Sequence, residues 1–134
     1  MTAKFVHHIC VQTNQYEKSL HFYQKALGFS LIQESPHFHK RDFNTWLRLG
    51  SFYIELQTGK EGEHLADVNI ISKGIVHFCL WVENLDKEVQ HLKNLGVDFL
   101  LKNGREIYRV ENGSLCKVIA PEGTIIELRD NKEI

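Results

Sequence analysis

The chain has 134 residues, 43% of them hydrophobic and 25% charged, and its formal net charge is -1 with the histidines neutral. This length accommodates one domain with a substantial core, and the composition is that of an ordinary globular protein. No Lys/Arg cluster indicates a nucleic-acid partner, no stretch is long enough to cross a membrane, and the first residues lack the apolar run of a secretory signal. The chain has three cysteines. So small and odd-numbered a set fits a reducing compartment better than a disulfide scaffold, so a cytoplasmic location is predicted.

The first half of the chain predicts a strand, a helix and three further strands. Asn14 is expected to cap the helix, in which Leu20, Tyr23 and Leu27 recur at helical spacing before Gly28 ends it. The strands expected in this half are residues 5–12, 29–34, 44–49 and 52–57. Gly50-Ser51 predicts a two-residue hairpin turn between the last two strands.

The second half predicts the same order of elements. Its first strand is expected at 74–81, and Asn84 is expected to cap the helix that follows. The apolar stripe of that helix is expected to consist of Leu85, Val89, Leu92 and Leu95. The remaining strands are expected at 98–102, 114–120 and 124–129. The loops 34–43 and 104–113 are expected to be variable and to supply substrate contacts.

These two halves form an internal repeat. His77 follows His8 by 69 residues, Gly96 follows Gly28 by 68, and Glu127 follows Glu55 by 72. Anchors in the same order at nearly constant offset indicate duplicated modules. The prediction is therefore one domain, 1–134, made of modules 4–58 and 73–130 with a polar linker at 59–72.

Strand alternation predicts a metal site. Alternate side chains point to opposite faces, so His8 and His77 are expected on the polar faces of their strands, while Glu55 and Glu127 interrupt apolar closing strands. Two imidazoles and two carboxylates suit one divalent metal: Zn, Ni, Fe, Co or Mn. The alternative is a polar, metal-free cavity, and the completeness of the donor set favours the metal.

Other polar residues near these positions carry weaker predictions. Cys10 and Cys79 are expected to line the cavity as protonated thiols rather than as thiolate ligands. His7 is expected on the face opposite His8. Trp46 and Arg48 are expected on the Glu55 face. Arg48 there has two alternative roles: it binds a carboxylate or phosphate of a ligand, or it is a side chain that is exposed or paired with a glutamate.

The sequence resembles the vicinal oxygen chelate superfamily of glyoxalases, bleomycin resistance proteins and extradiol dioxygenases. The segments that carry the resemblance are residues 19–29, 53–56, 76–78, 120–123 and 126–128, together with His8. The resemblance implies an α+β fold of two tandem βαβββ modules that form a curled mixed sheet around a metal site.

Within this superfamily, the set His8, Glu55, His77 and Glu127 is most similar to that of bacterial glyoxalase I. It implies a metal-dependent lyase or isomerase acting on a small α-oxo or α-hydroxy carbonyl compound. The metal would chelate vicinal oxygens and stabilise an enediolate while Glu127 or Glu55 moves a proton. Glyoxalase I has Arg where this chain has Gln12, so glutathione is not implied as the thiol.

Two other functions stay open at this point. One is an Fe- or Mn-dependent dioxygenase, and the other is a small-molecule-binding protein of the resistance type without catalysis. The residues expected to bind the substrate, which can be an anion, are Arg48, Trp46 and Gln12. The resemblance also implies a homodimer, with the metal site either within one chain or shared between two chains.

Overall fold

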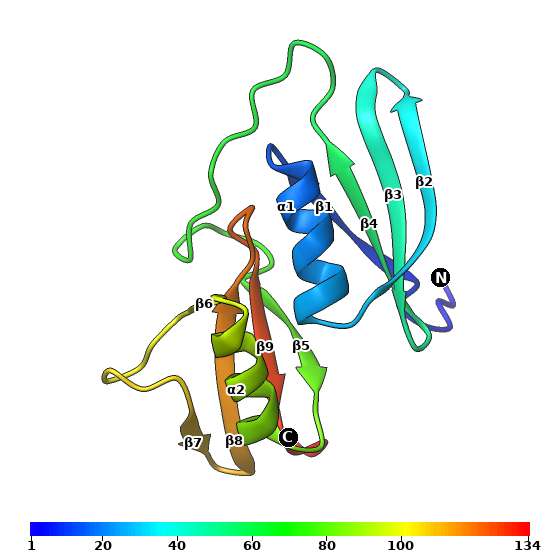
Figure 1. Ribbon diagram of the computed structural model, residues 1–134. Helices are drawn as coiled ribbons and strands as arrows, with labels where there is room; N and C mark the ends of the chain where they lie inside the picture. The colour runs from blue at the N-terminus through cyan, green and yellow to red at the C-terminus, as the bar shows by residue number, and fades with distance from the viewer. The chain divides into compact units, whose positions relative to one another are not determined.

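The computed structural model describes residues 1–134, which divide into two compact units, Met1–Ala66 and Asp67–Ile134. Each unit is described by itself (Figure 1). The α+β fold of two βαβββ modules is confirmed, with one mixed sheet in each unit. No helix in the structure has the length and apolar character that crossing a membrane requires.

Unit 1 begins with a strand and a helix. Its elements are β1 (His8–Thr13), α1 (Tyr16–His21), the π-helical turn η1 (Phe22–Ala26), β2 (Ser30–Phe38), β3 (Arg41–Leu49) and β4 (Phe52–Thr58). The strand order is β1-β4-β3-β2, with β1 parallel to β4 and the other pairs antiparallel. The predicted Gly50-Ser51 turn is confirmed, because Leu49 pairs with Phe52.

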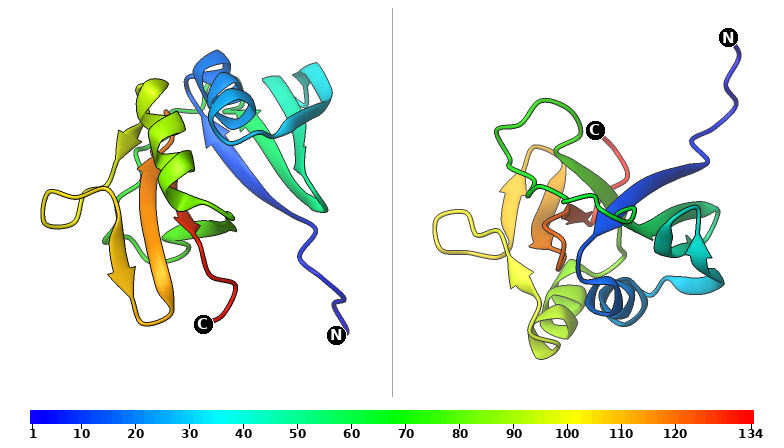
Figure 2. Two further views of the ribbon diagram at one scale, coloured as in Figure 1. Left: turned by 60° about the horizontal axis from the view of Figure 1, so that its bottom comes forward. Right: turned by 90° about the horizontal axis from the view of Figure 1, so that it is seen from above.

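Unit 2 repeats this arrangement with one strand divided. Its elements are β5 (His77–Trp81), α2 (Leu85–Asn94), β6 (Asp98–Phe99), β7 (Tyr108–Val110), β8 (Gly113–Ile119) and β9 (Ile125–Arg129). The order is β5-β9-β8-β6, β7 also pairs with β8, and β5 runs parallel to β9. The long loop between β6 and β7 extends beside the sheet (Figure 2).

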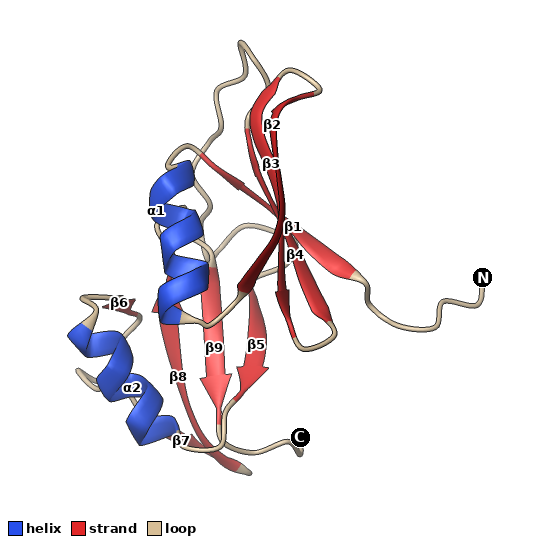
Figure 3. Cartoon of the chain, turned by 45° about the vertical axis from the view of Figure 1, so that its right-hand side comes forward, coloured by secondary structure: helices blue, strands red, loops and turns tan.

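In each unit the helix covers one face of the sheet (Figure 3). Below the helix of unit 1 the fully buried side chains include Tyr23, Leu47, Ile54 and Leu56. The corresponding core of unit 2 contains Leu92, Cys116, Val118, Ile126 and Leu128. Since side chains alternate along a strand, burial of these residues directs their neighbours, including Glu55 and Glu127, to the opposite face.

The structure corrects several expected boundaries. β1 starts at His8 rather than at residue 5. The expected loop 34–43 is instead mostly strand, because β2 and β3 continue to a turn at His39-Lys40, where φ is 46° and 65°. Such positive φ values are uncommon for residues other than glycine, and the sequence there carries no Asn-Gly or Asp-Gly signal. β7 within 104–113 was also not expected.

The two expected helix caps differ in outcome. Asn84 is a cap, since its Oδ1 accepts a hydrogen bond from the Lys87 amide at 3.0 Å. Asn14 is not, because its side chain reaches the Leu65 carbonyl and Thr13 Oγ1 accepts from the Gln15 amide instead. Leu95 also leaves the predicted apolar stripe of α2, because it follows the helix and is 47% exposed.

Replacing Asn84 by Ala should lower the free energy of unfolding by about 1 kcal/mol, because an α2 amide loses its acceptor. Urea denaturation measures the change. Asn84→Asp is the control, since its carboxylate oxygen can still accept the bond. Equal stability of Asn84→Ala and the parent chain would show that the cap contributes nothing.

Candidate metal centre

In unit 1, parallel pairing of β1 with β4 brings one histidine to one glutamate. Cys10 stands opposite Glu55 and His8 opposite Tyr53, so His8 and Glu55 lie diagonally on the same face. His8 Nε2 is 3.6 Å from Glu55 Oε2, and the two side chains are 36% and 22% exposed. The pair therefore has open access to solvent or to a ligand.

Unit 2 repeats the arrangement with β5 and β9. Cys79 stands opposite Glu127, and His77 Nε2 is 3.4 Å from Glu127 Oε2. The side chain of Glu127 is only 9% exposed, against 33% for His77. Each unit thus presents one imidazole and one carboxylate in the same relation.

The separations within these pairs suit two ligands of one metal ion. Ligand atoms about 2.1 Å from a metal are roughly 3.0 Å apart at a right angle and about 3.4 Å apart at a tetrahedral angle. The observed 3.6 and 3.4 Å exceed the usual N–H···O hydrogen-bond length. Nitrogen and carboxylate donors together suit a divalent transition metal. The donor set therefore fits such an ion.

Neither pair completes a metal site by itself. No group of three or more His, Cys, Asp or Glu side chains in the structure could hold a metal ion. The structure brings His8 to Glu55 and His77 to Glu127, two donors in each unit. The four-residue site expected from the sequence remains a prediction that requires both pairs.

His7 lies on the His8 side of the sheet, so its predicted position on the opposite face is wrong. Its Nδ1 is 2.9 Å from His8 Nδ1, and its ring stacks on Tyr53 with centroids 5.3 Å apart and an interplanar angle of 11°. The His8 ring also meets the edge of Trp46 at 4.9 Å. Strand alternation does not extend to His7 because β1 begins one residue later. His7 thereby orients the His8 ring and leaves its Nε2 toward Glu55.

The remaining polar face of unit 1 follows the register of the strands. Trp46 pairs with Glu55 and Arg48 with Tyr53, so both lie on the Glu55 face as predicted. Arg48 is exposed and forms no ion pair in the structure. Gln12 lies farther along the same face, where its Oε1 accepts hydrogen bonds from Arg41 Nη1 at 3.1 Å and Gln57 Nε2 at 3.4 Å.

Lys117 distinguishes unit 2 from unit 1. It pairs with Glu127 in the sheet and places its Nζ 3.7 Å from Glu127 Oε2. Its counterpart in unit 1, the residue that pairs with the glutamate, is therefore Trp46. Tyr108 lies on the same face, opposite Leu115, and burial followed by the charge of Glu127 raises its pKa.

The two cysteines beside these pairs remain thiols. Burial, followed by the negative charge of Glu55, raises the pKa of Cys10 to about 11, although the charge of Arg41 opposes this. Burial, followed by the charge of Glu127, likewise raises the pKa of Cys79 to about 11. Both side chains are therefore protonated near neutral pH, the state expected of lining residues rather than of thiolate ligands.

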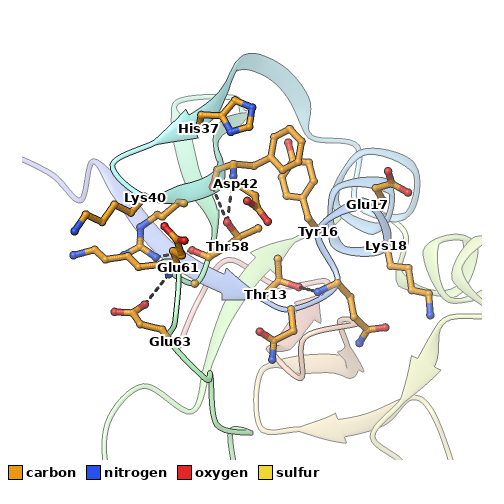
Figure 4. A pocket seen from close by; sticks show the side chains of 16 residues that line it. Thr13, Tyr16, Glu17, Lys18, His37, Lys40, Asp42, Thr58, Glu61 and Glu63 are labelled. Atoms are coloured by element: carbon orange, nitrogen blue, oxygen red, sulfur yellow. Dashed lines mark hydrogen bonds between the residues drawn. The ribbon is translucent and has the colours of Figure 1, made fainter.

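A pocket of about 890 Å³ opens in unit 1 at the carboxyl ends of β1 and β4 (Figure 4). Thr13 and Thr58 line it, together with Tyr16 and Phe43, whose stacked rings have centroids 4.2 Å apart. The Tyr16 hydroxyl is bonded to Glu34 and Thr45. This pocket could not be expected from the sequence, because the β2–β3 hairpin that borders it was expected to be a loop.

Comparison with known proteins identifies the family. The model of the Glyoxalase/Bleomycin resistance protein/Dioxygenase superfamily matches residues 5–110. YwkD, an uncharacterized protein of Bacillus subtilis (strain 168), is 34% identical over 99 residues, which cover 73% of this chain and 77% of YwkD.

Two solved structures show the same fold at low identity. One is a point mutant of the fosfomycin resistance protein FosX from Listeria monocytogenes, complexed with Mn(II) and 1S,2S-dihydroxypropylphosphonic acid (TM-score 0.73, 16% identity, covering 98% of this chain and 93% of FosX). The other is lactoylglutathione lyase from Agrobacterium tumefaciens (TM-score 0.69, 14% identity, covering 96% and 95%). With the family match and the repeated His–Glu pairs, these likenesses lead to one conclusion: the chain belongs to the glyoxalase/bleomycin resistance protein/dioxygenase superfamily.

Proposed function

We propose that this protein is a metal-dependent lyase or isomerase of the glyoxalase I type that acts on a small α-oxo or α-hydroxy carbonyl compound. The observation that carries the proposal is the presence of one His–Glu pair at the corresponding place in each unit. A reaction that moves a proton between adjacent carbons needs a Lewis acid and a mobile base, and this donor set can supply both.

His8, Glu55, His77 and Glu127 would together hold one divalent ion, for which Zn, Ni, Fe, Co and Mn are the candidates. The metal would stabilise negative charge that develops on the carbonyl oxygens of the substrate. The complex of FosX with Mn(II) supports the idea that this fold accommodates a divalent metal. Trp46 and Arg48 lie beside the unit 1 pair, Gln12 lies farther along the same face, and these three residues would contact the substrate.

The two glutamates are the candidates for the base that moves the proton. Glu127 is buried and lies beside the ammonium of Lys117, whereas Glu55 is more exposed and has only His8 as an ionic neighbour. The base has to move away from its resting position, and the Glu55 carboxylate is less restrained than that of Glu127. Glu127 would then hold its position and keep the carboxylate charge balanced by Lys117.

The second carboxylate also favours an isomerase over a dioxygenase. A dioxygenase of this superfamily would require only His8, His77 and Glu127, and would leave Glu55 without a role. Glu55 Oε2 lies 3.6 Å from His8 Nε2, much as Glu127 Oε2 lies 3.4 Å from His77 Nε2, which supports a donor role for both glutamates. A resistance-type binding protein would require neither pair.

Proton exchange tests the reaction. In D2O, the metal-loaded protein should exchange the proton adjacent to the carbonyl of dihydroxyacetone or lactaldehyde, which proton NMR detects. Glu55→Gln, which removes the mobile base, should slow the exchange by roughly 10²-fold or more, the usual contribution of general acid–base catalysis, and Glu127→Gln should slow it by weakening the hold on the metal. Exchange at the parent rate in both variants, or uptake of O2 with the same substrates, would contradict the proposal.

Metal content tests the ligand set. The purified protein should bind about one divalent ion per chain, and His8→Ala or His77→Ala should each abolish tight binding. His64→Ala is the control, because His64 is exposed outside both His–Glu pairs. Unchanged metal content in both ligand variants would remove the assignment.

We also propose a homodimer, in which one chain or two chains supply the four donors. Mixing His8→Ala chains with His77→Ala chains separates the two arrangements. If the donors of one site come from two chains, a mixed dimer regains one intact site and binds metal; if they come from one chain, all sites stay empty. A monomer in sedimentation analysis at micromolar concentration would exclude the dimer.

A further inference from the structure

Arg129 lies on the face of unit 2 that carries the His77–Glu127 pair. It follows Glu127 by two residues on β9, the strand between β5 and β8, so the two side chains share one face of the sheet (Figure 3). The strand register places two neighbouring rows across this face: Cys79, Glu127 and Lys117 in one, and Trp81, Arg129 and Leu115 in the other. The rows are about 6.6–6.8 Å apart along the strand.

The charge of Arg129 acts at the same place as the pair. Burial, followed by the negative charge of Glu127, raises the pKa of Cys79 to about 11, and the positive charges of Arg129 and Lys117 both oppose this rise. Cys79 stands opposite Glu127 in the sheet. Because the interaction between two charges weakens as they move apart, the guanidinium of Arg129 lies near the carboxylate of Glu127 rather than far from it.

The guanidinium of Arg129 has no partner in the protein. Its Nε is buried without a hydrogen bond, and no carboxylate forms an ion pair with it. The cross-strand neighbours explain this, because Leu115 carries no acceptor and the Trp81 indole donates its own N–H to the Asp130 carbonyl at 3.3 Å. A buried donor of a charged group that stays unpaired costs free energy, which a bound acceptor would recover.

Buried polar atoms without a partner gather on this face. Three such side-chain atoms occur in the chain, and two of them, His77 Nδ1 and Arg129 Nε, belong to it. The residue of unit 1 that corresponds to Arg129 is Gln57, a neutral side chain whose Nε2 donates to Gln12 Oε1 at 3.4 Å. A buried, unpaired donor at this place is therefore a feature of unit 2 and not of the fold that the two units share.

One positive charge is in excess beside the pair. Lys117 and Arg129 are cations, and Glu127 is the one carboxylate of the two rows. Lys117 Nζ is 3.7 Å from Glu127 Oε2, so these two charges balance each other, and the ammonium of Lys132 is placed over the Trp81 ring at 4.0 Å. Arg129 stays uncompensated. A single guanidinium matches a carboxylate, which carries one negative charge and presents two oxygens to a planar edge.

We infer that Arg129 binds a carboxylate of the substrate while the vicinal oxygens of the same molecule lie at the His77–Glu127 pair. This inference rests on the proposed function, and it specifies the substrate class: an α-oxo or α-hydroxy carbonyl compound with a carboxylate separate from its vicinal oxygens. Because the two rows are neighbours, a molecule of about five carbons is long enough to reach from one to the other.

Two five-carbon acids that differ at one end test the inference. 2-Oxoglutarate has vicinal oxygens at one end and a second carboxylate at the other, whereas 2-oxovalerate has the same vicinal oxygens and ends in a methyl group. Calorimetry with Zn(II)-loaded protein should show roughly ten- to hundredfold tighter binding of 2-oxoglutarate, the range for a charge-assisted hydrogen bond. In Arg129→Gln this preference should disappear, because only 2-oxoglutarate loses an interaction.

Two further variants separate recognition from charge alone. Arg129→Lys keeps the charge without the planar edge and should retain part of the preference. Arg109→Gln is the matched control, because Arg109 is an exposed arginine of the same sheet that pairs with Ser114 and lies on the other face. It should bind both acids like the parent chain. Equal affinities of the parent chain for the two acids, or an undiminished preference in folded Arg129→Gln, would overturn the inference.

The Arg129 Nε–H signal supplies a test that needs no variant. Because this atom is buried, its proton is shielded from exchange with water and NMR can observe it. Added 2-oxoglutarate should shift the signal to saturation in metal-free and in Zn(II)-loaded protein, and a signal unmoved in both forms would overturn the inference. Absence of Zn(II) uptake with a shifting signal would refute the proposed function but not the carboxylate site. Zn(II) uptake with an unmoved signal would refute the carboxylate site alone.

Discussion

The parallel pairing of the first and last long strands within each unit is the constraint on which the candidate site depends. It sets Cys10 against Glu55 and Cys79 against Glu127, so the histidine two residues earlier lies diagonally beside the carboxylate. The hydrophobic effect holds this register. A slip by one residue would turn Glu127 toward the core below α2 and expose Ile126, which is fully buried.

Identical donors in the two units have different surroundings. In unit 1 the pair is bordered by the rings of His7, Trp46 and Tyr53, and Glu55 remains accessible. In unit 2 an ammonium replaces the indole at the corresponding position, and the carboxylate is buried beside it. Duplication therefore explains the geometry that the two units share. The roles proposed for the two glutamates differ because one position, Trp46 in unit 1, is Lys117 in unit 2.

Much of the fold follows from the sequence because burial and strand alternation are local rules. The faces of Glu55 and Glu127, the Asn84 cap and the Gly50-Ser51 turn were all predicted from spacing. His7 was misplaced because the position of the first strand residue, which decides where alternation begins, is not encoded in the pattern. Asn14 does not cap the first helix, because the helix starts one residue later than expected, after Gln15, and its cap has no side-chain hydrogen bond.

Contacts between distant segments could not be predicted. Arg41 reaches Gln12 across 29 residues, through a hairpin whose turn lacks the usual glycine or asparagine signal. The register of Lys117 depended on the exact length of the turn around Pro121-Glu122-Gly123.

X-ray absorption spectroscopy of the protein loaded with one equivalent of Zn(II) tests the central claim most directly. The account predicts nitrogen and oxygen ligands at about 2.0–2.2 Å, with the outer-shell scattering of two imidazole rings, and the loss of this spectrum in His8→Ala, which no longer binds the ion tightly. Sulfur ligands at about 2.3 Å, or a spectrum unchanged in both His8→Ala and His77→Ala, would contradict it.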